Sequence, residues 1–444
     1  MEILEKTRSM IERYPLCSYC LGRQFALLGQ GISNEKRGEV LKLLLTMQAH
    51  QQALSGRKAG VKLLKTLATN GFFSMAEKLL KKMGKRVKRK HQSCYLCEDC
   101  FEFADELAEK SLEKLDGVEY STFLVGVKLP VEVEERADEF KAEFEVTHGE
   151  SIRNGFSRVI GKKIAQATRK EVNYKNPEVV VLINPFTKQV KLQLNPLYIT
   201  GRYRKLVRGI PQSKWLCPKC QGEGCEQCNW TGKMYPESVE EFIAEPVLEK
   251  TGGQEASFHA SGREDIDARM LGRGRPFVIE IKKPIKRFLN LENLEKTINR
   301  HAEKKVEVRG LHLSDKDSLR KLKKWETAQK LYRILVEFDR EVSDEELSVL
   351  EKALTKIMVH QQTPQRVLHR RANRVREKYI YETKVKRLTP NKAEIRVRCQ
   401  GGLYVKELIT GDEGRTKPNV AGIIHAETTP LELDVLNVFI GKQK

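Results

Sequence analysis

The chain has 444 residues, of which 40% are hydrophobic and 32% charged, and its 81 lysines and arginines outnumber 60 aspartates and glutamates to give a net charge of +21. Two or three domains are expected, and the positive excess favours a polyanionic partner, nucleic acid before an anionic membrane surface. No apolar run approaches the roughly 20 residues that span a bilayer, and the charged N-terminal segment lacks the apolar core of a signal peptide. The sequence therefore predicts a cytoplasmic protein without membrane attachment.

The N-terminal region is predicted to be a helical accessory region over residues 1–117, because apolar residues recur there at helical spacing. It contains a basic run at 81–90 in which seven of ten residues are cationic. Such a density favours binding to an RNA backbone, with Lys85 and Arg86 as candidate contacts. The alternative is a solvated helix face.

Residues 118–213 change in character and predict a small α/β RNA-binding module. Phe123–Val127 is typical of a strand, 157–170 of a basic helix, and 179–183 and 190–194 of two strands joined by a turn. A basic segment follows, in which Arg204 and Arg208 are candidate RNA contacts.

Cysteine spacing predicts metal sites, since disulfides are rare in cytoplasmic proteins. In the insert 214–235, two C-x2-C hooks supply four thiolates for one tetrahedral zinc: Cys217, Cys220, Cys225 and Cys228. Four cysteines leave no open coordination position, so the predicted role is structural. The alternative is four unligated thiols.

A second four-thiolate site requires two distant half-sites to meet. Cys17 and Cys20 form one, and we expect Cys94 and Cys97 to form the other, because they repeat the C-x2-C spacing. Cys100 would then be spare, although the pair Cys97 and Cys100 is the alternative, as are buried free cysteines. Two structural zinc ions follow from these patterns. The isolated Cys399 lies in an alternating run and is predicted to be a buried strand residue.

From residue 236 to the end the pattern is α+β, and the chain as a whole is predicted to be a multidomain α+β protein. Alternating apolar residues at 277–281 and 332–338 predict strands. Ser343 and Glu346 form a capping box that predicts a helix over 347–359. A second basic stretch at 366–376 contains Arg370 and Arg371 and is typical of a loop that grips RNA, with a plain charged loop as the alternative.

A carboxylate lies in a glycine- and arginine-rich loop at 261–277, just before a strand. Folding does not require four arginines there, whereas phosphate binding around one acidic group would use them; these candidates are Arg263, Arg269, Arg273 and Arg275. In an extended segment Asp265 and Asp267 point to the same face and Glu264 points away. The residues themselves leave both aspartates open as the reactive group.

Gly262-Arg263-Glu264-Asp265 resembles the catalytic Gly-Arg-x-Asp loop of pseudouridine synthases. The longer string to Phe277 resembles the tenth family of these enzymes, Pus ten, found in archaea and eukaryotes. The resemblance covers the whole chain, with a THUMP-like RNA-binding domain at 118–213 and a mixed-sheet catalytic domain at 236–444. It implies isomerisation of uridine 54, uridine 55 or both in the TΨC loop of tRNA. Nothing is oxidised or imported in that reaction, so no organic cofactor is needed.

The resemblance also implies individual roles. Asp265 would be the nucleophile or base, in preference to Asp267, and Lys406 in the motif at 403–408 would be the cation paired with it. Tyr332 would be the active-site tyrosine that stacks on the base, and Val405 and Leu433 would form walls of the pocket. The implied partner is the TΨC arm of tRNA, with no obligatory protein partner.

Two other functions remain open on sequence grounds. A THUMP-bearing tRNA methyltransferase or thiolase would carry a glycine-rich cofactor loop or a Ser-Gly-Gly-x-Asp string, and the chain has neither. A non-catalytic, zinc-dependent RNA-binding protein is suggested by the segment 217–224, which resembles a chaperone zinc repeat, but the chain lacks the His-Pro-Asp signature of a co-chaperone.

Overall fold

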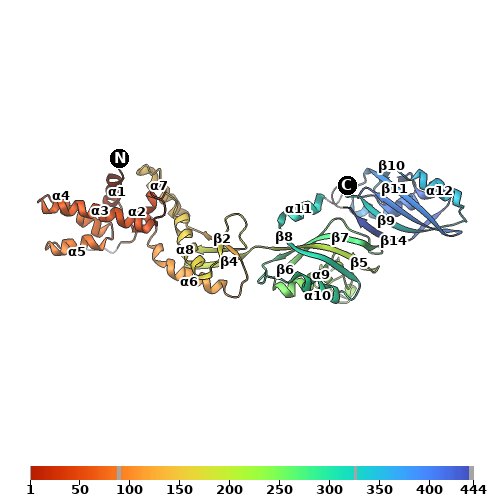
Figure 1. The fold of residues 1–444 in the computed structure, drawn as a ribbon, viewed down its shortest axis with the longest axis horizontal. Coiled ribbons are helices and arrows are strands. Elements are labelled where there is room, and N and C mark those ends of the chain that lie inside the picture. The colour runs from red at the N-terminus through yellow and green to blue at the C-terminus, as the bar shows by residue number, and fades with distance from the viewer. Residues whose placement is uncertain (1, 88–91, 325–327, 440–444) are drawn as a thin grey trace. The chain divides into compact units, whose positions relative to one another are not determined.

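The computed structural model describes residues 2–87, 92–324 and 328–439, apart from the side chains of residues 323, 324 and 370. The chain divides into two compact units, Met1–Asn195 and Pro196–Lys444 (Figure 1). Helices and strands occur in both, which confirms the predicted α+β class. Among the described residues, no helix is long and apolar enough to cross a membrane.

The first unit begins with helices. Their bounds are α1 (Ile3–Arg13), α2 (Ser18–Gly22), η1 (Arg23–Phe25), α3 (Asn34–Leu54), α4 (Lys58–Thr69), α5 (Ser74–Lys82), η2 (Cys100–Phe103) and α6 (Ala104–Leu115). Helices α2 and α3 cross closely because each has a glycine where they meet. A Cβ on Gly22 would lie 1.8 Å from the carbonyl oxygen of Asn34, and one on Gly38 would lie 2.0 Å from that of Ser18. The crossing fixes the segment that carries Cys17 and Cys20.

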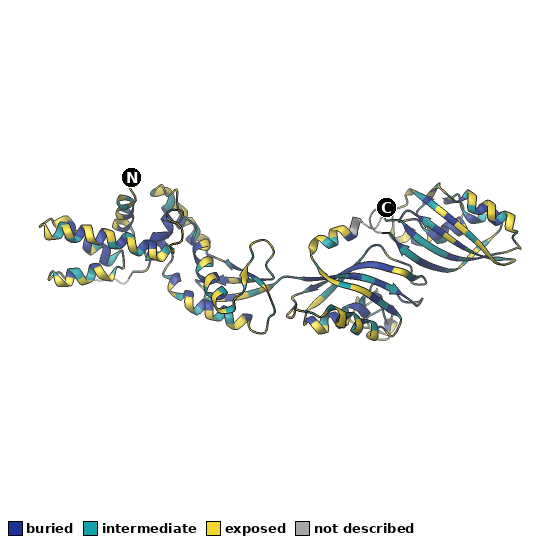
Figure 2. Cartoon of the chain, in the orientation of Figure 1, coloured by how far each residue is buried: buried dark blue, intermediate teal, exposed yellow. Residues whose placement is uncertain are grey.

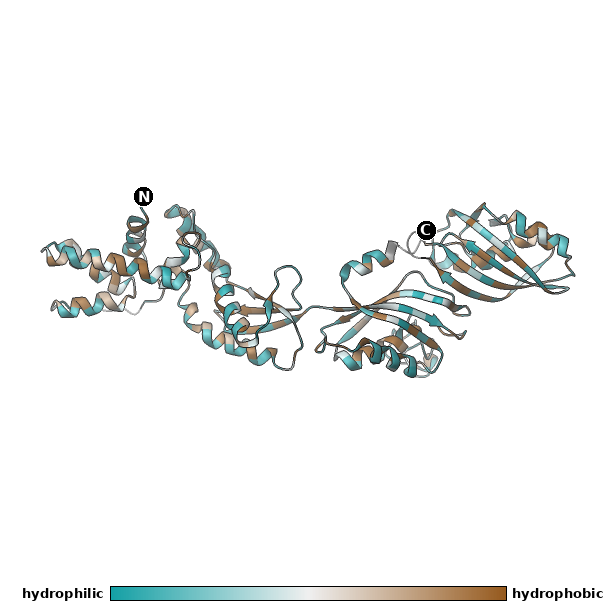
Figure 3. Ribbon diagram, in the orientation of Figure 1, coloured by the Kyte–Doolittle hydropathy of each residue, from teal (hydrophilic) through white to brown (hydrophobic). Residues whose placement is uncertain are grey.

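A four-stranded sheet completes the first unit. Its strands are β1 (Thr122–Val127), β2 (Glu171–Val172), β3 (Val179–Asn184) and β4 (Gln189–Leu194), in the order β2-β1-β3-β4, with α7 (Val131–Glu143) and α8 (Ile152–Thr168). Strand β1 is parallel to β2 and β3, and β4 is antiparallel to β3. Helix α8 starts earlier than predicted because Ser151 caps it by accepting a hydrogen bond from the backbone N–H of Asn154. One hydrophobic core extends from Met10 to Val190 (Figures 2 and 3), so the accessory helices and the sheet pack as one body.

The second unit is built on a mixed ten-stranded sheet in the order β13-β10-β11-β12-β9-β14-β7-β5-β8, with β6 paired to β7. Its strands are β5 (Leu197–Lys205), β6 (Glu255–Ala260), β7 (Arg269–Lys282), β8 (Val306–Ser314), β9 (Lys330–Phe338), β10 (Ile357–Gln362), β11 (Val375–Thr389), β12 (Lys392–Cys399), β13 (Thr416–Lys417) and β14 (Thr428–Val438). Strands β14 and β7 pair in parallel, over two residues each, whereas β14 with β9 and β5 with β7 are antiparallel. Cys399 ends β12 and is fully buried, as predicted.

Two large hydrophobic cores and one small cluster, formed by Tyr198, Val278 and Leu322, lie on this sheet. The helical elements are η3 (Glu226–Cys228), α9 (Val239–Thr251), α10 (Leu291–His301), α11 (Lys316–Lys324), α12 (Asp344–Ala353), η5 (Gln365–Arg370), α13 (Val405–Thr410) and α14 (Val420–Ile424). Helices α9 and α10 pack on β5 to β8, and α12, α13 and α14 pack against β9 to β12. Tyr332 contacts both cores.

The structure corrects two sequence-based boundaries. The chain divides after Asn195 and not after residue 213, because β5 pairs with β7 and β8 inside the second sheet. The second unit therefore begins well before residue 236. The helix predicted over 347–359 ends at Ala353, and Lys356 takes a left-handed φ of 56° that turns the chain into β10. The capping box itself is present.

A buried carboxylate holds three strands of the second unit together. Asp434 on β14 is fully buried and accepts hydrogen bonds from Arg269 at 2.8 and 2.9 Å, from Arg208 at 2.7 Å and from Arg333 at 3.0 Å. Burial alone raises the pKa of this carboxyl, but the hydrogen bond of Arg269 and the charge of Arg208 outweigh it and the pKa is lowered. Arg208 and Arg269, predicted to contact RNA, are thus engaged in the fold.

Replacing Asp434 by Asn should destabilise β14 by on the order of 3 kcal/mol at neutral pH, because three guanidinium groups lose their buried partner. The lowered pKa means that the stabilisation is complete above the usual pKa of about 3.9 and is lost as pH falls through the lower folded-state value. The difference in the free energy of unfolding between wild type and Asp434→Asn should therefore disappear in acid. Urea unfolding, together with hydrogen exchange of the β14 amides, measures this difference.

The control is Glu432→Gln. The half-exposed carboxylate of Glu432 contacts the same arginines, and its loss should lower the free energy of unfolding by less than about 1 kcal/mol. Equal effects of the two variants would contradict the argument.

Candidate active site

The acidic loop at 261–268 connects β6 to β7 at a change of strand partner. Strand β6 pairs with the later part of β7, whereas β14 pairs with its first residues, Arg269 and Met270. The loop therefore lies between the part of β7 that pairs with β14 and the part that pairs with β6. Backbone at such a position is not committed to a ladder, which leaves its side chains free to form a site.

The inner side of this loop is fixed by a buried ion pair. The Glu264 carboxylate and the Arg275 guanidinium lie 2.9 Å apart with side-chain exposures of 0% and 1%. Glu264 also accepts a hydrogen bond from the hydroxyl of Tyr203 at 3.0 Å, and Arg275 donates to the carbonyl of Ser261 at 2.7 Å. The prediction that Arg275 contacts phosphate is therefore wrong: its guanidinium is enclosed and serves the loop from inside.

The backbone at Asp265 and Ile266 is held by a buried lysine. Lys205 on β5 donates hydrogen bonds to the carbonyls of Asp265 and Ile266, both at 3.1 Å, and to that of Ile210 at 2.9 Å. Burial lowers the pKa of Lys205, and the nearby acidic groups act in the opposite direction. Three carbonyl acceptors fix where the Asp265 main chain lies, and hence where its side chain begins.

On the outer side, two carboxylates share two cations. Asp265 is 40% exposed; its Oδ2 lies 3.3 Å from Arg366 and 3.7 Å from Lys406 Nζ. Lys406 donates a shorter hydrogen bond of 2.6 Å to Asp267, which is 64% exposed. Partial burial raises the pKa of Asp267, but Lys406 outweighs this and lowers it. Arg366 is anchored by a 2.6 Å hydrogen bond to Glu407.

These groups open into a pocket of about 890 Å³ that lies within the second unit. The structure brings Asp265, Tyr332, Lys406, Val405 and Leu433 together in its lining, although they come from four separate elements or loops. Burial is the main cause that raises the pKa of the Tyr332 phenol, so the ring stays protonated at neutral pH. The cations in the lining are Arg263, Lys330, Arg366, Arg371, Arg376, Lys378 and Lys406. A polar pocket with a partly buried tyrosine and excess positive charge suits a nucleotide.

The other predicted RNA contacts differ in whether their side chains are exposed or paired. Arg263, Arg273 and Arg371 are exposed, and Lys85 and Arg86 are exposed in the first unit. Arg204 is paired with Glu307 at 2.8 Å. The side chain of Arg370 and residues 88–90 of the first basic run are outside the described residues.

Sequence reasoning did not single out several residues of the pocket. Arg366 was visible as part of a basic stretch, but nothing in that stretch marked it as a cation close to Asp265. Lys330 and Trp215 also line the pocket. The signal for Trp215 was its position two residues before Cys217.

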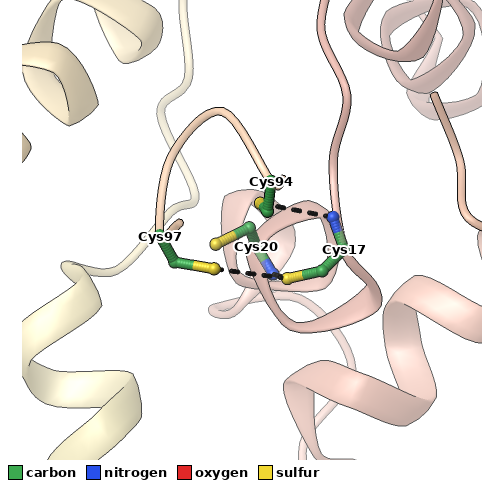
Figure 4. Close-up of side chains that lie close together, drawn as sticks. All are labelled: Cys17, Cys20, Cys94 and Cys97. Carbon is green, nitrogen blue, oxygen red and sulfur yellow. Dashed lines mark hydrogen bonds between the residues drawn. The ribbon is translucent and has the colours of Figure 1, made fainter. Parts of the chain in front are cut away.

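The first cysteine cluster lies in the helical unit (Figure 4). The sulfurs of Cys17, Cys20, Cys94 and Cys97 lie within 4.8 Å of one another, and Cys100 is outside the group. Cys17 and Cys97 Sγ are 3.7 Å apart, close to the spacing of about 3.8 Å expected for ligands of a tetrahedral zinc with 2.3 Å bonds. The backbone N–H of Cys17 points at Cys94 Sγ at 3.3 Å. The expected grouping, with Cys94 and Cys97 as the second half-site, is confirmed.

The second cluster lies in the insert. The sulfurs of Cys217, Cys220, Cys225 and Cys228 lie within 4.8 Å of one another, and three of the pairs are 3.7 to 3.8 Å apart. Backbone N–H groups of Cys220 and Lys219 lower the pKa of the Cys217 thiol, which favours the thiolate that a metal requires. Each cluster could therefore hold one metal ion.

Comparison with known proteins decides the family. The family described as "Pus10, C-terminal" matches residues 198–439, and "Pus10 THUMP domain, archaeal" matches residues 107–184. The tRNA pseudouridine synthase Pus10 of Methanocaldococcus jannaschii is 42% identical over 447 residues, covering 99% of this chain and 94% of that protein. The chain belongs to the Pus10 family.

Other relatives agree with this assignment. The protein of the same name from Methanothrix thermoacetophila is 40% identical over 428 residues, covering 96% of this chain and 92% of that protein. Among solved structures, "Crystal Structure of a Cbf5-Nop10-Gar1 Complex" contains a chain with a TM-score of 0.28 and 14% identity, covering 44% of this chain and 42% of that chain. Membership of Pus10 confirms the expected family and the enzyme class, pseudouridine synthase. The THUMP match begins inside α6 and ends with β3, earlier at both ends than predicted.

The cluster geometry of this Pus10 chain predicts two tightly bound metal ions. Cys94→Ser should release one of them, because a four-sulfur site is deprived of a ligand, whereas Cys100→Ser should retain both. Elemental analysis after dialysis measures the stoichiometry. Retention of both ions in Cys94→Ser, together with release in Cys100→Ser, would mean that Cys97 and Cys100 are the ligands.

Proposed function

We propose that the chain is a tRNA pseudouridine synthase that isomerises uridine in the TΨC loop, at position 54, position 55 or both, with Asp265 as the reactive group. The observation that carries this proposal is the pocket in which the half-exposed Asp265 carboxylate adjoins Tyr332, Arg366 and Lys406. Pus10 membership supports the reaction class, and the names of the relatives support tRNA as the substrate.

The proposed chemistry needs an ionised carboxylate next to a sugar. Pseudouridine forms when the N-glycosidic bond breaks, the base rotates and a carbon of the base bonds to the sugar. That carbon loses its proton, and the released ring nitrogen takes up a proton. In the proposed reaction Asp265, whose Oδ2 lies 3.3 Å from Arg366 and 3.7 Å from Lys406, acts as nucleophile or base at the nucleoside. Asp267 is the rival, but its closest partner is Lys406 and it is more exposed. We therefore assign it to positioning Lys406.

The remaining pocket residues would hold the target base. Tyr332 is flat, protonated and packed against two cores, which favours stacking on the uracil over service as a resting base. Val405 and Leu433 supply apolar walls. The target uridine must leave its stack to enter, and the cations of the lining would bind the phosphates around it. No organic cofactor is required, and we assign zinc to both cysteine clusters as a structural ion.

Asp265→Asn should lower pseudouridine formation to background while tRNA binding stays within about threefold, because the amide keeps the shape and removes the reactive oxygen anion. Asp267→Asn is the matched control and should retain turnover, reduced by at most about tenfold through Lys406. Single-turnover assays on unmodified tRNA with nucleoside mapping measure both. If Asp267→Asn is the inactive variant and Asp265→Asn turns over, the two roles are exchanged.

The basic run of the first unit should contribute to binding through phosphates. Replacing Lys85 and Arg86 together by Ala should flatten the dependence of log affinity on log salt by roughly 0.7 to 0.9 for each phosphate that the variant no longer neutralises. It should raise KM more than it lowers kcat, since neither residue touches the reacting uridine. Lys62 and Lys65, exposed on α4, are the matched control pair for alanine replacement. An equal slope change in the control pair would show that only overall charge matters.

A further inference from the structure

The four-cysteine insert of residues 214–235 starts and ends beside the substrate pocket. Trp215 lines that pocket. At the base of the insert, Met234 donates a backbone hydrogen bond to the carbonyl of Trp215 at 2.9 Å, and Leu216 forms a bridge with Lys233. The Trp215 ring meets Tyr235 edge-on, with centroids 5.7 Å apart and planes at 79°. The two ends of the insert thus close around an aromatic pair.

The same tryptophan touches the reactive loop. The guanidinium of Arg263 lies 5.4 Å from the centre of the Trp215 ring, a cation–π interaction. Arg263 is exposed and lies two residues before Asp265, and Trp215 is half-buried. Gln212, just before the insert, donates to the carbonyl of Gly262 at 3.0 Å. The insert and the reactive loop therefore meet at one rim of the pocket.

The insert has little apolar core of its own. Leu216, Trp230 and Met234 are 49%, 73% and 52% exposed. Its backbone segments instead approach one another closely. A Cβ on Gly232 would lie 2.4 Å from the carbonyl oxygen of Gly222, so the two segments can be this close only because residue 232 is a glycine. Metal coordination by the four sulfurs would fix the backbone of the insert. Because Cys217 is one of the ligands, coordination would also fix the position of Trp215, two residues earlier.

We infer that Trp215 and Arg263 form a stacking platform for an RNA base next to the target uridine, and that the metal-held insert positions this platform. The inference rests on the proposed function. When the target uridine leaves its stack, its neighbour is left without a stacking partner, and an indole at the pocket rim replaces it. Arg263 supplies positive charge for the adjoining phosphate. A four-cysteine site has no open position for chemistry, so positioning a substrate-binding residue is a role that it can fill.

Fluorescence tests the platform directly. The chain has three tryptophans, at 215, 230 and 325, so Trp230→Phe with Trp325→Phe leaves Trp215 as the sole indole. In an Asp265→Asn background, unmodified tRNA should quench its emission and protect it from acrylamide as binding saturates. Unchanged emission at saturation, with binding followed independently by filter retention, would overturn the inference.

Replacing Cys225 by Ser in the same background tests the role of the insert. This variant should release one metal ion and weaken the quenching of Trp215. Full quenching after metal release would overturn the role of the insert.

Kinetics separate the platform from the proposed function. Trp215→Ala should raise KM by roughly tenfold, the scale of removing one base stack, with a smaller effect on kcat. Trp215→Phe should restore KM most of the way to the wild-type value. Trp230→Phe, an exposed aromatic of the same insert, should change KM by less than about twofold. If the wild-type chain makes no pseudouridine, the proposed function fails; if it is active and Trp215→Ala has an unchanged KM, only the platform fails.

Discussion

The buried pair of Glu264 and Arg275 is the interaction on which the active site depends. Two charges with almost no exposure are costly unless each is paired and hydrogen-bonded, and here Tyr203 and the Ser261 carbonyl complete the set. Glu264 is enclosed behind the loop, whereas its neighbour Arg263 is exposed and Asp265 is 40% exposed. Fixing Glu264 in this way also limits where the Asp265 carboxylate can lie.

Arginines of this chain divide into two groups that composition cannot separate. Arg275 pairs with Glu264, and Arg269 and Arg208 pair with Asp434, so these three stabilise the loop and the strands. Arg263 and Arg371 keep exposed guanidinium groups at the pocket. A net charge of +21 is therefore a poor guide to which cations meet RNA, since many of them neutralise carboxylates inside the fold.

Local patterns in the sequence predicted what depends on local spacing. The C-x2-C hooks, the capping box at Ser343 and the segment around Asp265 are short motifs whose residues act together. The assignment of β5 to the second sheet, the proximity of Arg366 to Asp265 and the approach of Trp215 to Arg263 depend on strand pairing and loop closure over long separations. Arg275 was misassigned for the same reason: its partner Glu264 lies on the other side of a turn that the sequence does not specify.

The two sides of the loop differ in how strongly their ion pairs hold it. On the outer side, Lys406 lies 2.6 Å from Asp267 and 3.7 Å from Asp265, and ion pairs whose carboxylates are this exposed contribute at most about 1 kcal/mol. Breaking a buried pair such as Glu264 and Arg275 costs several kcal/mol. The buried pair therefore constrains the loop more strongly than the outer ion pairs of Asp265 and Asp267 do.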